Sequence, residues 1–345
     1  MFGVHQTLYK QLHPSLIHVK RLARNKPKRL MNLSTVYTMS TTYKTIINDM
    51  KTSLKLAWGR ALSYFLANLG MLTVVAILGL LIAIPVAAVA YLAFAPFSEA
   101  TIDALAKWGR DNFFVSGTIV LLVGTFIASL LMVVSGSIYG MSHDLVTKGD
   151  TRAETAFSYL RLKFLTFMST GAMLSIIVLM PPVIVWGLTS YALDHVITTA
   201  VAALLAVFAF VWIFITGGLT SMVFPAVVSG KGVQAAFKES FSLASRYFDR
   251  IFGLLSAIVL LLAATFGPVV LLAFVAPELV TPPMIPPMMM AFIPAMVAMG
   301  IWTVVSVFLW LLLFLPMVRI AWVRVYQELT GGTIATQSVV SMPIV

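Results

Sequence analysis

Basic side chains collect in two short polar segments that separate long apolar runs of the chain. The segments at 148–163 and 231–250 hold eight of them: Lys148, Arg152, Arg161, Lys163, Lys231, Lys238, Arg246 and Arg250. Ammonium and guanidinium groups beside an apolar run attract the phosphates of anionic lipids, at about 1 kcal/mol per base near the membrane surface. We therefore expect these eight side chains to bind lipid headgroups.

The elements that position these bases follow from composition. Hydrophobic residues make up 60% of the 345 residues and charged residues only 10%. Six apolar stretches exceed the ~20 residues that a helix needs to cross a bilayer: 65–94, 113–139, 164–193, 196–228, 251–275 and 295–322. The sequence predicts an all-α fold, a polytopic membrane bundle of about six transmembrane helices.

Charge placement predicts the orientation of this bundle. Of the 23 Lys and Arg residues, all but Lys107 and Arg110 fall on one side of the predicted spans. Loops rich in Lys and Arg stay in the cytoplasm. We therefore expect a multi-pass protein of the cell (plasma or inner) membrane with both termini cytoplasmic.

The first 40 residues form a basic segment without acidic residues. We interpret residues 1–40 as a flexible cytoplasmic tail that lies on anionic lipid, and we do not expect it to bind nucleic acid. No signal peptide is visible, because no short apolar segment follows the basic one. Met31 and Met39 are alternative start residues to Met1.

Three amphipathic helices are predicted, each directly before a transmembrane hairpin. At 233–248 the apolar residues Val233, Phe237, Phe241, Ala244 and Phe248 are spaced by three or four positions, as on one helical face. Segments 43–65 and 152–164 show the same pattern. We expect these faces to lie in the membrane interface, in repeat units at 41–142, 143–228 and 229–330 with a tail at 331–345. Phe65, Phe164 and Phe248 begin the three hairpins, at spacings of 99 and 84 residues.

Residues 222–260 resemble the membrane domain of glycerophosphodiester phosphodiesterases and of related uncharacterised bacterial and archaeal multi-pass proteins. The matching positions are Pro225, Gly230, Lys231, Gly232, Ala236, Phe237, Lys238, Ser240 and Phe248. The enzymes of this family carry a separate soluble barrel with metal-binding carboxylates and histidines, and no segment here is long enough to form one. The resemblance implies the membrane domain alone, without the hydrolase activity.

The residue types needed for catalysis are scattered. The chain has no cysteine, and its histidines are His5, His13, His18, His143 and His195. The two pairs His143/Asp144 and Asp194/His195 are expected on opposite sides of the membrane, so they cannot share a metal. We expect a non-enzymatic protein without cofactors that serves as a scaffold, an accessory subunit or an organiser of lipids, with lipids, other membrane subunits or its own copies as partners.

A permease-type transport component is the alternative. Its prolines would kink spans, and Ser129, Thr170, Thr216 and Thr220 would line a polar path. The middles of the spans lack charged residues, which disfavours ion-coupled transport. Arg319 and Arg324 are expected to reach the headgroups from the end of the last span.

Two further patterns have local meanings. Gly136 and Gly140 form a small-xxx-small pattern that is typical of close helix contacts. The segment 281–290 gathers Met284, Met288, Met289 and Met290 in a proline-rich loop on the outer side. Thioethers bind Cu(I), so copper capture is a remote alternative function.

Overall fold

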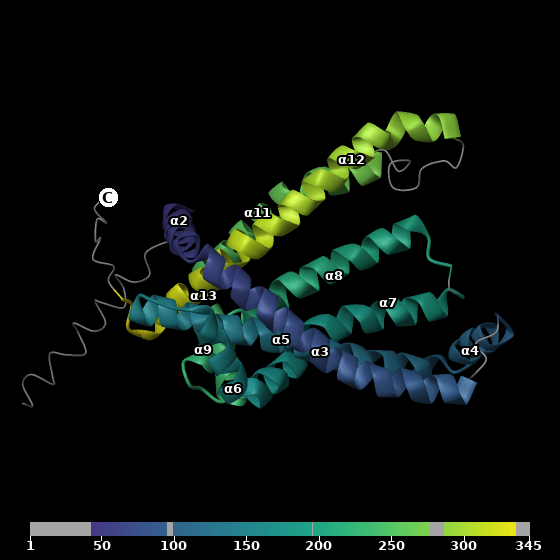
Figure 1. Cartoon of the computed structure of the whole chain (residues 1–345), viewed down its shortest axis with the longest axis horizontal. Coiled ribbons are helices and arrows are strands. Elements are labelled where there is room, and N and C mark those ends of the chain that lie inside the picture. The colour runs from purple at the N-terminus through teal and green to yellow at the C-terminus, as the bar shows by residue number, and fades with distance from the viewer. Residues whose placement is uncertain (1–42, 95–98, 195, 276–285, 336–345) are drawn as a thin grey trace, which may run out of the picture. The chain divides into compact units, whose positions relative to one another are not determined.

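The computed structural model describes residues 43–94, 99–194, 196–275 and 286–335 (Figure 1). All regular elements within these ranges are helical, and six helices are long and apolar enough to cross a membrane. The prediction of an all-α polytopic membrane bundle is confirmed. The chain divides into two compact units, Met1–Thr45 and Ile46–Val345, and the second contains the membrane bundle.

Several of the six spans consist of more than one helical segment. They are formed by α3 (Ala61–Phe94), by α5 (Phe113–Lys148), by α6 (Ala153–Leu174) with η1 (Ser175–Leu179) and α7 (Met180–Ala192), by α8 (Thr199–Thr220) with α9 (Val223–Val228), by α11 (Phe248–Val275), and by α12 (Pro286–Leu309) with η3 (Trp310–Phe314) and α13 (Leu315–Thr330). Each predicted span overlaps one of these elements, but the bounds differ by up to eleven residues, because α6 includes the segment 152–164 that was expected to be a separate amphipathic helix. Helix α12 also begins earlier, inside the segment expected to be a proline-rich loop.

Three shorter helices flank the spans. Helices α2 (Tyr43–Gly59) and α10 (Val233–Arg246) occupy two of the segments predicted to be amphipathic, while the third forms the start of α6. Helix α4 (Glu99–Asp111) was not predicted, although Ile102, Leu105 and Trp108 are spaced by three residues. All three of these side chains are exposed.

The backbone departs from helical geometry inside the third span and immediately before the fifth. Lys163 has φ −124° and ψ 19° inside α6, and Tyr247 has φ −119° and ψ 44° between α10 and α11. These two breaks are 84 residues apart, the spacing found for the aromatic residues. The break before the first span lies at Arg60, between α2 and α3, about one helical turn earlier than the same register would place it.

Prolines distort the spans, and a tryptophan compensates for one of them. Pro181 lacks an N–H, so the carbonyl of Ile177 four residues earlier loses its helical donor. The π-helical segment η1 surrounds that position, and Trp212 Nε1 of α8 donates to Ile177 O at 3.1 Å. A side chain from a neighbouring helix thus satisfies the backbone, as a membrane span requires.

Helices α5 and α6 approach each other closely because of glycines. A Cβ atom on Gly136 would lie 2.5 Å from the ring of Phe167, and one on Gly171 would lie 2.6 Å from Met132 Cβ. The ring of Tyr159 covers Gly140 in the same way. The predicted helix contact at Gly136 and Gly140 is confirmed, and it fixes where α6 crosses α5.

Most buried residues belong to one cluster at the basic ends of the spans, which we call the packed end. It comprises parts of α2, α6 and α10, the start of α3, the end of α5, α9, the start of α11 and α13. Phe237 and Ala244 of α10 are buried in this cluster. The expectation that this apolar face lies against lipid is therefore wrong for these two residues, because the face packs on protein.

Helix α2 presents a different face to the packed end. Its buried residues are Ile46, Asp49, Ser53 and Ala57. Trp58, from the predicted apolar face, is 71% exposed. Helix α2 therefore contacts the protein through a mainly small and polar stripe and leaves its largest apolar side chain outside.

The other halves of the spans bury little. We call 77–84 of α3, 204–211 of α8 and 301–309 of α12 the open segments. Leu81, Leu204 and Val304 in them are more than 60% exposed. Helices α11 and α12 run side by side (Figure 1). Apart from each other and the segments directly next to them in the chain, they contact few other helices.

Candidate functional site

The eight predicted lipid-binding bases divide into two groups of four. The first group makes internal contacts. Lys148 Nζ lies 2.8 Å from Asp144 Oδ2, and Lys231 Nζ lies 2.5 Å from Glu239 Oε2. Lys163 and Arg250, described below, are also engaged within the protein.

The second group consists of Arg152, Arg161, Lys238 and Arg246. All four side chains are exposed, and none forms an ion pair within the described part of the chain. Arg152 directly precedes α6 and Arg161 lies within it, while Lys238 and Arg246 lie on α10. The packed end thus carries four exposed bases that have no counter-ion among the described residues.

Lys163 stabilises the end of α9. Its Nζ donates to Val227 O at 2.7 Å and to Val228 O at 3.1 Å. The last carbonyls of a helix have no intrahelical donor and carry partial negative charge, so an ammonium group satisfies both needs. The break in α6 lies at Lys163 itself, where this side chain extends toward α9.

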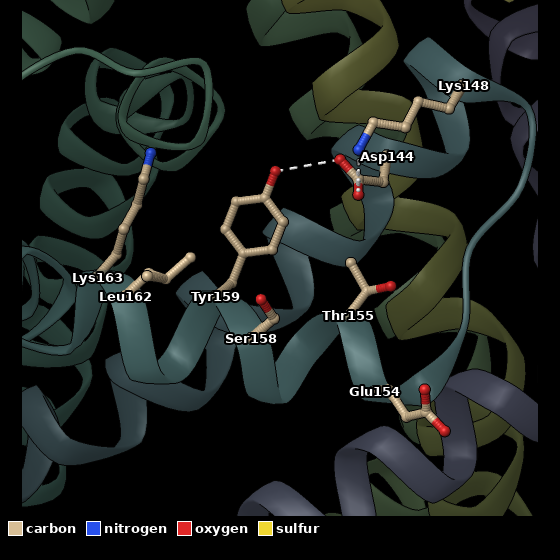
Figure 2. A pocket seen from close by; sticks show the side chains of 8 residues that line it. All are labelled: Asp144, Lys148, Glu154, Thr155, Ser158, Tyr159, Leu162 and Lys163. Atoms are coloured by element: carbon tan, nitrogen blue, oxygen red, sulfur yellow. Dashed lines mark hydrogen bonds and ion pairs between the residues drawn. The ribbon is translucent and has the colours of Figure 1, made fainter.

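A surface depression of about 470 Å³ lies between the end of α5 and the start of α6. Figure 2 shows its lining residues: Asp144, Lys148, Glu154, Thr155, Ser158, Tyr159, Leu162 and Lys163. Tyr159 stands in the middle and donates from its hydroxyl to Asp144 Oδ1 at 3.1 Å. Two of the predicted bases, Lys148 and Lys163, therefore share one site that contains two acids as well.

Arg250 joins three helices. Its Nη2 lies 3.0 Å from Asp49 Oδ2 of α2 and also contacts Glu328 of α13. The Arg250 side chain is 17% exposed and that of Asp49 is 8% exposed. Arg250 therefore tethers α2 to the packed end, and its guanidinium is occupied by protein carboxylates.

The packed end also contains a buried cation without a carboxylate. Arg319 is 6% exposed and donates from Nη1 to Asn68 Oδ1 at 3.1 Å, and it belongs to none of the ion pairs among described residues. The expectation that Arg319 reaches lipid headgroups is wrong, because α3 covers it. Arg324 is mostly buried too and lies 3.7 Å from Glu328. Hydropathy alone could not reveal this, since the partner Asn68 lies 251 residues away.

The hydroxyls proposed for a transport path are bonded within their own helices. Ser129, Thr170, Thr216 and Thr220 each donate to the carbonyl four residues earlier, at 2.6–2.7 Å. None of them lines the depression of Figure 2 or a second one of about 450 Å³ near Trp58.

The remaining candidates for chemistry lie partly outside the described residues. His143 Nδ1 is 3.7 Å from Asp144 Oδ1, whereas His5, His13, His18 and His195 are not described. Met284 is also outside the described residues. Met288, Met289 and Met290 lie in α12, but their side chains are not described. No group of three or more metal-binding side chains occurs in the described part of the chain.

Comparison with known proteins provides no relative from which a role could be transferred. No family model, curated protein or solved structure matches this chain.

Proposed function

We propose that this protein is a non-enzymatic scaffold or accessory subunit of a cell membrane that organises anionic lipids on its cytoplasmic side. The observation that carries the proposal is the group of four exposed bases, Arg152, Arg161, Lys238 and Arg246. They lie on the packed end, together with nearly all of the other Lys and Arg residues that the structure describes. By the positive-inside rule this end faces the cytoplasm.

The neighbouring apolar side chains support a position at the headgroup layer. Phe248 follows Arg246 closely and is 56% exposed, and Leu162 follows Arg161 and is 78% exposed. A base beside an exposed apolar side chain suits a site where phosphates lie above acyl chains. At about 1 kcal/mol per base, the four bases together would attract anionic lipid by roughly 4 kcal/mol.

The proposal includes a threefold repeat of an amphipathic helix and a transmembrane hairpin. The 84-residue spacing between the breaks at Lys163 and Tyr247 supports the second and third units. Three such units would repeat the basic surface around one bundle. This arrangement is in keeping with the proposed likeness to the membrane domain of glycerophosphodiester phosphodiesterases without their soluble barrel.

The test compares two variants with the same change of charge. The double substitution Lys238→Gln/Arg246→Gln removes one Lys and one Arg from α10, and Lys107→Gln/Arg110→Gln does the same on α4. Phosphatidylglycerol bound to each purified protein is measured by native mass spectrometry. We expect the α10 variant to bind it about thirtyfold more weakly, from about 1 kcal/mol for each of two bases, and the α4 variant to bind it as the unmodified protein does. Equal binding by all three proteins, or an equal loss in both variants, contradicts the proposal.

A further inference from the structure

The depression between α5 and α6 carries charges of both signs in equal number. Lys148 and Lys163 are balanced by Asp144 and Glu154. Its polar groups come from two helices: Tyr159, Asp144 and Lys148 meet in one part of it, and Lys163 and Glu154 lie on opposite sides of it (Figure 2). A volume of about 470 Å³ lies within the ~300–1,000 Å³ that is usual for sites of small ligands. Because Lys148 and Asp144 pair with each other, the charges that a ligand would meet are those of Glu154 and Lys163, which are of opposite sign.

Several polar groups of the depression remain available to a ligand. Lys148 and Tyr159 both bind Asp144, so that part is satisfied internally. Glu154 is exposed and forms no ion pair with any described residue. Lys163 uses two of its three protons on α9, and the hydroxyls of Thr155 and Ser158 face the hollow (Figure 2). The site thus offers one free carboxylate as an acceptor, and one ammonium proton and two hydroxyls as donors.

An apolar surface adjoins the depression. Leu162, which lines it, is 78% exposed, and Leu165 is 77% exposed. These are the largest exposures among the large apolar side chains of the described residues. They flank Lys163, at the break where α6 changes direction. A polar depression next to exposed leucines can bind the polar and the apolar part of an amphiphile, whereas a soluble ion would use only the polar part.

We infer that this depression binds the headgroup of a zwitterionic phospholipid with a primary amine, such as phosphatidylethanolamine. The Glu154 carboxylate accepts from the lipid ammonium, while Ser158 and Thr155 donate to the phosphate. The Lys163 ammonium lies more than one helical turn further along α6 and attracts the phosphate without touching it. Ser158 lies one helical turn from Glu154, a separation that suits the short link between phosphate and amine. The acyl chains then lie on Leu162 and Leu165. The inference rests on the proposed function in that this end of the bundle lies at the headgroup layer, and it adds a second lipid class at a defined site.

The experiment measures binding of lipids to the full chain by native mass spectrometry. The ligands are phosphatidylethanolamine, phosphatidylcholine, phosphatidylglycerol and soluble phosphoethanolamine. Glu154→Gln removes the acceptor charge, and Leu162→Asn removes the apolar support. Glu99→Gln is the matched control, because Glu99 lies in the first turn of α4 as Glu154 lies in the first turn of α6.

The unmodified protein should prefer phosphatidylethanolamine to both other lipids. Glu154→Gln should weaken this binding about tenfold, Leu162→Asn should weaken it to a smaller degree, and Glu99→Gln should leave it unchanged. Binding of soluble phosphoethanolamine as tight as that of the lipid would overturn the assignment to a membrane lipid. Equal binding of the three lipids, or no effect of Glu154→Gln, would overturn the site itself.

The two proposals fail separately. Loss of phosphatidylglycerol binding in the Lys238→Gln/Arg246→Gln protein tests the exposed bases alone. Loss of phosphatidylethanolamine binding in Glu154→Gln tests the depression alone, because this substitution does not touch those bases.

Discussion

The packed end and the open segments are built from equally apolar spans, yet they are held together differently. At the packed end, residues from eight α-helices are buried in one hydrophobic cluster, and the polar residues Asn68, Ser137, Ser142 and Arg319 of the same helices are buried as well. In the open segments the leucines and valines of α3, α8 and α12 are exposed, apart from Leu205. Small and polar residues, rather than greater hydrophobicity, distinguish the half that packs.

The reason lies in the solvent. Lipid tails are as apolar as leucine, so transmembrane helices gain little from burying leucine against leucine. They gain from close packing at small residues and from hydrogen bonds between helices. The contact of Gly136 with Phe167 and the bond between Tyr64 and Ser142, at 3.0 Å, are of these two kinds. The comparison is therefore open to test by substituting the small and polar residues of each half.

The largest effect is expected from Asn68→Leu. This substitution leaves the buried Arg319 cation without its acceptor, since no described carboxylate is paired with it. We expect a loss of about 3 kcal/mol in the free energy of unfolding, measured by thermal denaturation in detergent. The double substitution Asn68→Leu/Arg319→Met removes both partners, and it should recover most of that loss because no buried charge remains. If the double variant were as unstable as the single one, the hydrogen bond between Arg319 and Asn68 would not be the reason why Asn68 stabilises the protein.

The helices could be predicted from sequence because apolar length and proline position are local properties. The spans were predicted from apolar length, and the close helix contact was predicted from the local spacing of Gly136 and Gly140. The burial of Arg319 and the inward apolar face of α10 did not, because both depend on partners far away in the chain. The sequence around a base near the end of a span does not show whether its side chain faces lipid or, like Arg319, a polar residue of another helix.

The second test concerns the close approach of α5 and α6. Gly136→Ala places a methyl group 2.5 Å from the Phe167 ring, and we expect it to cost about 2 kcal/mol in stability by overpacking. Gly124→Ala in the same helix meets nothing within 4 Å, and it should be neutral or stabilising because alanine favours helix. The melting temperature should fall for Gly136→Ala and stay the same or rise for Gly124→Ala, and an equal fall in both variants would contradict the assigned contact.

The candidate site was predictable only in part. The eight bases were identified by type and position, and the structure separates them into exposed ones and internally paired ones. The pairing partners Asp49, Asp144 and Glu239 carried no signal in the sequence, since acids near bases are common at membrane surfaces. The contribution of Glu154 and of the exposed Leu162 emerged only once α5 and α6 were placed together.

A smaller effect is expected where α2 meets the packed end. Asp49→Asn removes one of the two carboxylates on Arg250, while Glu328 remains. Because the guanidinium keeps a partner and is partly exposed, we expect a cost of about 1 kcal/mol. The substitution should also increase the cleavage of α2 by a protease added to the purified protein. Asp103→Asn on α4, an exposed acid without a described ion pair, is the control, and an equal response of the two variants would mean that Asp49 does not tether α2.

The smallest effect is expected in the open half, from Trp302→Phe. Trp302 Nε1 of α12 donates to Thr265 O of α11 at 3.0 Å, in the turn before Pro268. Hydrogen bonds between membrane helices contribute about 0.6 kcal/mol on average, and phenylalanine keeps most of the apolar contact. We therefore expect a melting temperature within about a degree or two of that of the unmodified protein, with faster amide exchange confined to α11 and α12.

Trp186→Phe, in which a half-exposed indole of α7 is lost, controls for loss of the ring system alone. If Trp302→Phe destabilised the protein as strongly as Asn68→Leu, the open half would be held by polar contacts as firmly as the packed end, and the distinction between the two would fall.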